Sequence, residues 1–162
     1  MTHVICLHVE NQQGVLARIS GLFSGRGYNL ESITAGVTTD PTVTRITLAC
    51  TGDDAVVEQI KKQLNRLIDV IKVTELTGVP SLNRELMLVK VNAKGPQRGE
   101  IFQVADVFKA QIMDVGHESM TVELAGSPEK IDDLVALLQP YGIAEMARSG
   151  VVAMERSRKT VI

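Results

Sequence analysis

The sequence predicts an α+β fold in which one pattern, strand–helix–strand–strand–helix–strand, occurs twice along 162 residues. Three observations support this prediction. Alternating apolar residues and helical apolar stripes follow one another in the same order in both halves. The stretch TGVPSLN (77–83), in which Gly78 and Pro80 interrupt the periodicity, separates the halves. The length suits two small domains, each near the lower limit for a self-sufficient core.

The first half begins with an alternating strand at 4–9, directly followed by a helix. The apolar residues at helical spacing are Val15, Leu16, Ile19, Leu22 and Phe23. Gly25 and Gly27 end this helix, Gly27 as a left-handed C-cap. Strands at 28–37 and 42–50 flank the hairpin signal TTDP. Asp53 caps a second helix, and residues 70–76 form the last strand.

The second half repeats this order with a strand at 86–93, a helix at 99–110 and a short hairpin over 111–126. Ser127 caps the next helix, with Pro128 at its first position. Residues 143–156 supply the last strand or strands. We therefore expect two ferredoxin-like βαββαβ units in tandem, each an antiparallel sheet with helices on one face. The predicted domains are residues 1–78 and 84–162, joined by a linker at 79–83.

The helices of the two halves correspond at fixed offsets. An offset of 85 matches the first helices, from Gly14 with Gly99 to Phe23 with Phe108. An offset of 74 matches the second helices, including Val57 with Ile131.

Apolar residues occur on both faces of the first strands, so we expect oligomerisation or packing against a partner to cover the face without helices.

The composition excludes several classes of function. A formal net charge of −2 provides no broad positive field for nucleic acid. No apolar run is long enough to cross a bilayer, and the N-terminus has the pattern of a strand, not of a signal peptide. Cys6 and Cys50 lie in apolar runs without CxxC spacing, which indicates core thiols in a reducing compartment. We expect a cytoplasmic protein.

No set of residues in the sequence predicts catalysis. His3 and His8 are five residues apart on one strand and fall on opposite faces, and His117 is in the other half, so no metal site is predicted. The glycines of SGRG follow the helix, whereas a phosphate loop places them before it. We therefore expect neither catalytic residues nor metal ligands.

The segment ENQQGVL (10–16) is a candidate anion site. The N–H groups at a helix start lack intrahelical partners, and Gly14 has no Cβ to block an approaching carboxylate. Asn11 could contact both the amino and the carboxylate group of an amino acid. Chemistry alone favours a simpler interpretation, in which Asn11 caps the helix and Gly14 turns the chain.

The segment ENQQGVLARISGLFSGRGYNLESITAG (10–36) resembles the start of an ACT domain, a regulatory amino-acid-binding module. Together with the continuation to residue 76, RELMLVKV after the linker and ARSGVVAMERS near the end, the whole chain is similar to the regulatory small subunits of acetolactate synthases (acetohydroxyacid synthases). The resemblance implies a subunit without catalysis of its own. Such a subunit activates a catalytic large subunit and confers feedback inhibition by valine in branched-chain amino-acid biosynthesis.

The resemblance also implies a site and its partners. Two ACT domains would pair side by side as a homodimer, with valine at their interface. Asn11, Gly14, Val15 and Leu16 would hold the ligand from one protomer, and Asn29 and Ile33 from the other. An alternative role for Asn29 is turn chemistry beside Gly27. The thiamine diphosphate, Mg and FAD would belong to the catalytic partner, with no cofactor in this chain.

Other functions and the role of the second half are left open. Pro96 is matched with Asn11 at the offset of 85, so the second half lacks an equivalent site and is expected to serve dimerisation or partner contact. A free-standing amino-acid sensor is a competing class, although the sequence has few basic patches for DNA. A small ferredoxin-like hydrolase would need an Arg in the loop after the first strand, and this loop has none.

Overall fold

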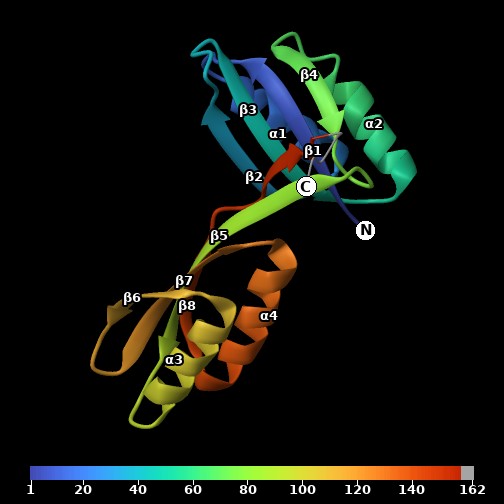
Figure 1. Cartoon of the computed structure of the whole chain (residues 1–162). Helices are drawn as coiled ribbons and strands as arrows, with labels where there is room; N and C mark the ends of the chain where they lie inside the picture. The colour runs from blue at the N-terminus through green and yellow to red at the C-terminus, as the bar shows by residue number, and fades with distance from the viewer. Residues whose placement is uncertain (158–162) are drawn as a thin grey trace. The chain divides into compact units, whose positions relative to one another are not determined.

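The computed structural model describes residues 1–157, which form two compact units. The first unit comprises residues 1–82 and 151–157, and the second comprises residues 83–150. Both are α+β units in which an antiparallel sheet carries its two helices on one face, as the sequence predicts (Figure 1).

The first unit follows the predicted βαββαβ order. Its elements are β1 (Thr2–Glu10), α1 (Val15–Arg26), β2 (Asn29–Val37), β3 (Val43–Thr51), α2 (Asp54–Leu64) and β4 (Val70–Glu75). The strand order is β2-β3-β1-β4, and every neighbouring pair is antiparallel. Alternate residues of β1, namely Ile5, Leu7 and Val9, are buried against both helices in one core.

Local signals explain where these helices begin and end. Asp53 caps α2 by accepting a hydrogen bond from the Val56 N–H at 2.8 Å, as predicted. Helix α1 ends at Gly27, whose φ of 66° lies in the left-handed region that glycine adopts without strain. The Tyr28 N–H then donates to the Phe23 carbonyl at 3.1 Å and turns the chain into β2.

The second unit repeats this order around a longer first strand. Its elements are β5 (Ser81–Asn92), α3 (Gln97–Phe108), β6 (Gln111–Val115), β7 (Ser119–Gly126), α4 (Pro128–Leu138), a 3-10 turn (Gln139–Tyr141) and β8 (Ile143–Arg148). The strand order is β6-β7-β5-β8. Ser127 caps α4 by accepting from the Lys130 N–H, which confirms that prediction.

The offset of 74 between the second helices is confirmed, because Val57 and Ile131 are both fully buried in their respective cores. The offset of 85 between the first helices is wrong. Helices α1 and α3 begin at Val15 and Gln97, 82 positions apart, which matches buried Ile19 with buried Ile101. The error of three residues is nearly one helical turn, so a shifted apolar stripe fits the sequence almost as well.

The predicted domain bounds need correction at two places. Residues 81–83 belong to β5, so the chain is already a strand within the predicted linker 79–83. A further strand, β9 (Val152–Glu155), pairs with β5 and belongs to the first unit, not to a second domain extending over 84–162. The Arg156 N–H donates to the Pro80 carbonyl at 2.8 Å within that unit. The predicted range 158–162 lies outside the described residues.

The C-terminal segment 151–157 covers part of the sheet face that the helices leave open in the first unit. Val151 and Ala153 pack with Cys6 and Leu76 in a small separate cluster, bordered by Val4. This segment of the same chain therefore buries apolar surface that the sequence assigned to a partner. In the second unit, Leu86 and Leu88 on β5 remain 42% and 40% exposed.

We expect Ala153→Asp to destabilise the first unit selectively, by at least about 2 kcal/mol, because it places a charge at a site that is 1% exposed. Hydrogen exchange should show lost protection in β1 and β3, with β7 unaffected. Val152→Asp is the matched control, because this neighbouring side chain is 51% exposed. Equal loss of protection in both variants, or loss confined to β7, would contradict the assignment of β9 to the first unit.

Candidate functional site

The loop between β1 and α1 is fastened to the hairpin loop between β2 and β3. The Asn11 N–H donates to the Thr42 carbonyl at 2.8 Å, and its side-chain Nδ2 donates to the Pro41 carbonyl at 2.9 Å. No side chain caps α1, so the interpretation of Asn11 as a helix cap is wrong. Within residues 1–157, the carboxamide oxygen of Asn11 has no hydrogen-bond partner and can still accept from a ligand.

Gly14 is the N-cap of α1, with a φ of 80° that favours glycine. Because no side chain caps the helix, its first N–H groups keep their capacity to bind an anion. A Cβ at Gly14 would lie 3.3 Å from Nη1 of Arg18, which is tighter than ordinary van der Waals contact. The position therefore combines free N–H donors with a close neighbour, the flexible end of the Arg18 side chain.

Arg18 brings a positive charge beside this helix start, and sequence reasoning missed it. Its Nε donates to Oδ2 of Asp69 at 2.7 Å, and the Asp69 carbonyl accepts from the Glu10 N–H at 2.8 Å. The Asp69 side chain is 7% exposed, whereas that of Arg18 is 48% exposed. The signal available in the sequence was the spacing of four residues from Gly14, which places Arg18 one helical turn along α1.

The other four predicted ligand residues have differing environments. Val15 is buried in the first core, and Ile33 is partly buried against it. Leu16 is 47% exposed at the start of α1. Asn29 begins β2, where its Nδ2 donates to Oγ1 of Thr51 at 2.6 Å.

One chain does not bring the two groups of predicted residues together. Asn29 pairs with Thr51, which pairs with Thr2 at the first end of β1. Asn11 follows Glu10 at the other end of β1. Eight residue steps at about 3.3 Å each separate these ends by about 26 Å. A ligand touching both Asn11 and Asn29 therefore requires a second copy of the chain.

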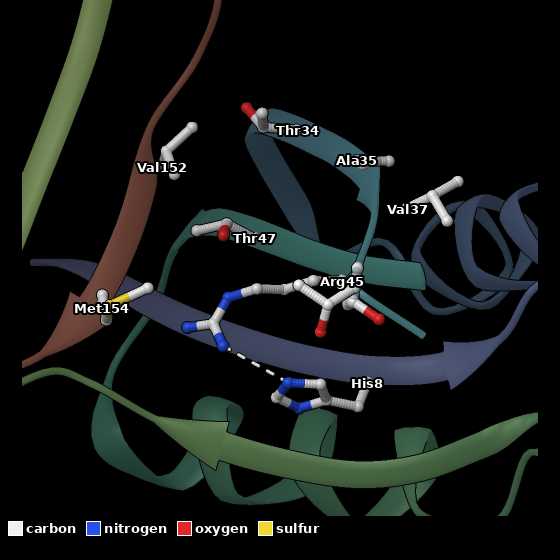
Figure 2. A pocket seen from close by; sticks show the side chains of 11 residues that line it. His8, Thr34, Ala35, Val37, Arg45, Thr47, Val152 and Met154 are labelled. Carbon is white, nitrogen blue, oxygen red and sulfur yellow. Dashed lines mark hydrogen bonds between the residues drawn. The ribbon is translucent and has the colours of Figure 1, made fainter. Parts of the chain in front are cut away.

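A second feature is a pocket of about 530 Å³ on the helix-free face of the first sheet (Figure 2). Its wall comes from β1, β2, β3, the β2–β3 loop and β9. The residues that line it are His8, Thr34, Ala35, Gly36, Val37, Thr38, Thr39, Arg45, Thr47, Val152 and Met154. Sequence analysis did not predict this pocket, because it depends on β9 returning to a distant strand.

Comparison with known proteins places both units in one family. The family model of the AHAS small subunit-like ACT domain matches residues 5–72, and the model of the small subunit of acetolactate synthase matches residues 84–157. A probable acetolactate synthase small subunit of Archaeoglobus fulgidus is 47% identical over 159 residues, covering 98% of this chain and 99% of that protein. The acetolactate synthase isozyme 3 small subunit of Escherichia coli is 44% identical, covering 98% of both.

A solved structure agrees. The crystal structure of the acetolactate synthase small subunit from Thermotoga maritima has a TM-score of 0.89 and 35% sequence identity, covering 98% of this chain and 99% of that one. The chain belongs to the family of acetolactate synthase small subunits. Residues 5–72 of the first unit are the ACT domain of this family. Residues 84–157, which include the second unit and the β9 segment of the first, match the model of the small subunit of acetolactate synthase.

The C-terminal region of this small-subunit chain differs from the ACT domain at the equivalent loop. The Ala93 N–H donates to the Glu118 carbonyl as the Asn11 N–H does to Thr42, so Ala93 is the counterpart of Asn11. The predicted match of Pro96 with Asn11 is wrong, because Pro96 is the N-cap of α3 and corresponds to Gly14. Arg98 donates to the carbonyls of Ala93, Gly116 and His117. The guanidinium group of Arg98, in the first turn of α3, is thus already hydrogen-bonded to backbone carbonyls of the second unit.

The histidines and cysteines of the first unit lie on its strands β1 and β3. His3 lies 3.3 Å from Glu75 on the helix side of the sheet, and His8 lies on the open side, as predicted. Burial raises the pKa of the Cys6 and Cys50 thiols, so both stay protonated and poorly nucleophilic. Residues 1–157 contain no cluster of three metal-ligating side chains, and none of their helices is both long and apolar enough to cross a membrane.

We expect Arg18→Met to lower the free energy of unfolding of the ACT domain by about 1–3 kcal/mol, because it leaves the buried Asp69 carboxylate without its ion-pair partner. Arg26→Met in the last turn of the same helix serves as the control and should change it by less than about 0.5 kcal/mol. Urea unfolding followed by NMR signals of the ACT domain measures both. An unchanged midpoint for Arg18→Met would show that Arg18 does not support this loop.

The pKa of His8 is lowered by burial, then by the charges of Arg45 and Lys72. The unfolded chain therefore binds a proton more readily, and stability should fall as the pH drops below the ordinary value of 6.5. His8→Gln should reduce the loss of unfolding free energy between about pH 8 and about pH 5. The measurement is urea unfolding of both proteins across that range. An identical loss in wild type and variant would contradict the lowered pKa.

Proposed function

We propose that this chain is the non-catalytic regulatory subunit of an acetolactate synthase. It binds the catalytic large subunit, raises its activity, and mediates feedback inhibition by valine in branched-chain amino-acid biosynthesis. The observation that carries the proposal is the match of both units, over nearly the whole chain, to acetolactate synthase small subunits. The uncapped helix start at Gly14 supports an amino-acid ligand as the effector.

In the proposed site, the valine carboxylate lies at the start of α1. The N–H groups after Gly14 and the charge of Arg18 both favour a negative group there. The carboxamide oxygen of Asn11 accepts from the ammonium group, and the exposed side chain of Leu16 contacts the isopropyl group. Val15 supports this loop from the core beneath it.

The proposed site is completed by the ACT domain of a second copy, which makes the active form a homodimer. Asn29 and Ile33 of that copy supply the other wall. The separation of about 26 Å between the two ends of β1 supports this arrangement, since one chain cannot contribute both groups of residues to one small ligand. An Asn29 amide that already donates to Thr51 keeps its oxygen for the valine ammonium.

Valine would act by favouring one of two arrangements of this dimer. A coupling free energy of about 1–3 kcal/mol changes the activity of the partner by about 5–150-fold, which is sufficient for feedback. Discrimination against leucine is expected to be modest, because one methylene in an apolar pocket is worth about 1–3 kcal/mol. Leucine should therefore compete weakly with valine.

The cofactors of the reaction, thiamine diphosphate, Mg and FAD, are proposed to reside in the catalytic large subunit. We place the complex in the cytoplasm, where the buried, unpaired thiols of Cys6 and Cys50 would remain reduced. For the second unit we propose dimerisation or contact with the large subunit. The half-exposed Leu86 and Leu88 on its helix-free sheet face support this role.

The variant Gly14→Asp tests the site. Its carboxylate would stand at the helix start and repel the valine carboxylate, so valine inhibition of the reconstituted enzyme should weaken by at least about tenfold. The fold should survive, because aspartate tolerates left-handed backbone better than most residues. Asn11→Ala should weaken inhibition in the same direction but less severely.

Gly99→Asp is the control for added charge. It lies in the first turn of α3, where a Cβ would meet no neighbouring atom within 4 Å, and should leave valine inhibition unchanged. The test is the valine concentration for half-inhibition of catalytic subunit reconstituted with each variant. Inhibition by valine that is equally strong with Gly14→Asp and wild type would refute this site.

A further inference from the structure

The pocket on the helix-free face of the ACT-domain sheet contains a positive charge that no acidic group compensates. Arg45 projects from β3 into it, as Figure 2 shows. Its Nη1 lies 3.3 Å from Nε2 of His8, and its Nη2 donates to the Ala153 carbonyl at 2.8 Å. Within residues 1–157, Arg45 makes no ion pair, and its buried Nε has no acceptor.

The contact with Arg45 fixes the state of His8. A guanidinium group can only donate, so Nε2 of His8 must accept and the proton must lie on Nδ1. That Nδ1 is buried and has no partner either. Two neighbouring side chains therefore keep unsatisfied donors beside one uncompensated charge. The uncompensated charge costs free energy in this partly buried position, and a bound anion would compensate it.

The surroundings of this charge indicate which anion fits. Lys72, the partner of His8 on β4, adds positive charge from the neighbouring strand, and β2 and β9 contribute no carboxylate to the wall. Thr47, which is 3% exposed, supplies a hydroxyl beside Arg45. The apolar side chains that line the pocket include Val152 and Met154 of β9 and Val37 of β2, and Figure 2 shows the two β9 residues on one side and Val37 on the other.

We propose that this pocket binds a small organic carboxylate with an apolar body. The carboxylate pairs with the Nη groups of Arg45, each of which has a further N–H beyond its present contact. The body packs against Val152 and Met154. A free amino acid fits poorly, because its ammonium would lie near Arg45 and Lys72 with no acidic side chain to receive it. The site is therefore separate from the proposed valine site.

The test is an NMR titration of the full chain with 3-methylbutanoate, in the presence of excess valine. The ring signals of His8 and the methyl signal of Met154 should shift saturably, and the pKa of His8 should rise, since a nearby anion favours the imidazolium. The neutral analogue 3-methylbutanamide has nearly the same shape and should produce no saturable shift. This comparison uses the wild-type protein and does not depend on a variant that folds.

Two variants test whether the carboxylate contacts Arg45 and not Lys72. Arg45→Gln should weaken binding by about tenfold or more, because it removes the charge-assisted hydrogen bonds. Lys72→Gln should leave saturable binding in place, because Lys72 contributes charge from outside the pocket wall.

Three results would overturn the proposal: no saturable shift with 3-methylbutanoate, equal shifts with the amide, or binding by Arg45→Gln as tight as by wild type. A shift that occurs without valine but is lost in excess valine would also overturn the proposal, because 3-methylbutanoate would then be binding at the valine site. Failure of the valine site alone would leave the titration with 3-methylbutanoate unaffected.

Discussion

The structure of each unit depends on one constraint: a sheet has two faces, and its two helices cover only one of them. In the first unit, the side chains of Ile5, Leu7 and Val9 on β1 pack in the core with the helices. Those of Val4 and Cys6 lie on the opposite face of the sheet. The chain itself returns as β9 to cover part of this second side with Val151 and Ala153. The pocket around Arg45 lies beside this cover, so its existence follows from the same constraint.

The candidate effector site follows from the length of β1. Asn11 and Gly14 lie beyond one end of this strand, and Asn29 is aligned with the other end. A ligand no larger than an amino acid cannot span that separation, so the proposed site lies between copies of the chain. Regulation through such a site has a simple physical basis, because a ligand held by two copies stabilises the arrangement of the pair in which both walls meet.

Local patterns in the sequence were sufficient to predict the helices and strands. They were insufficient to predict which distant segments of the chain contact one another. The Asp53 and Ser127 caps and the buried stripes of the second helices were predictable, since each depends on residues within a few positions. The match of the first helices was wrong because a shift of three residues nearly preserves a helical stripe. The return of β9 and the role of Arg45 were not predictable, because no local pattern specifies which distant strand a segment will join.

Calorimetric titration of the purified chain with valine tests the proposed effector site most directly, with leucine and glycine as controls. We expect saturable heat corresponding to one or two valine molecules for each pair of chains, with weaker binding of leucine. Glycine, which lacks the apolar side chain, should bind far more weakly than either. The absence of saturable heat with valine, or equal heat with glycine, would contradict a valine site built by two copies of this chain.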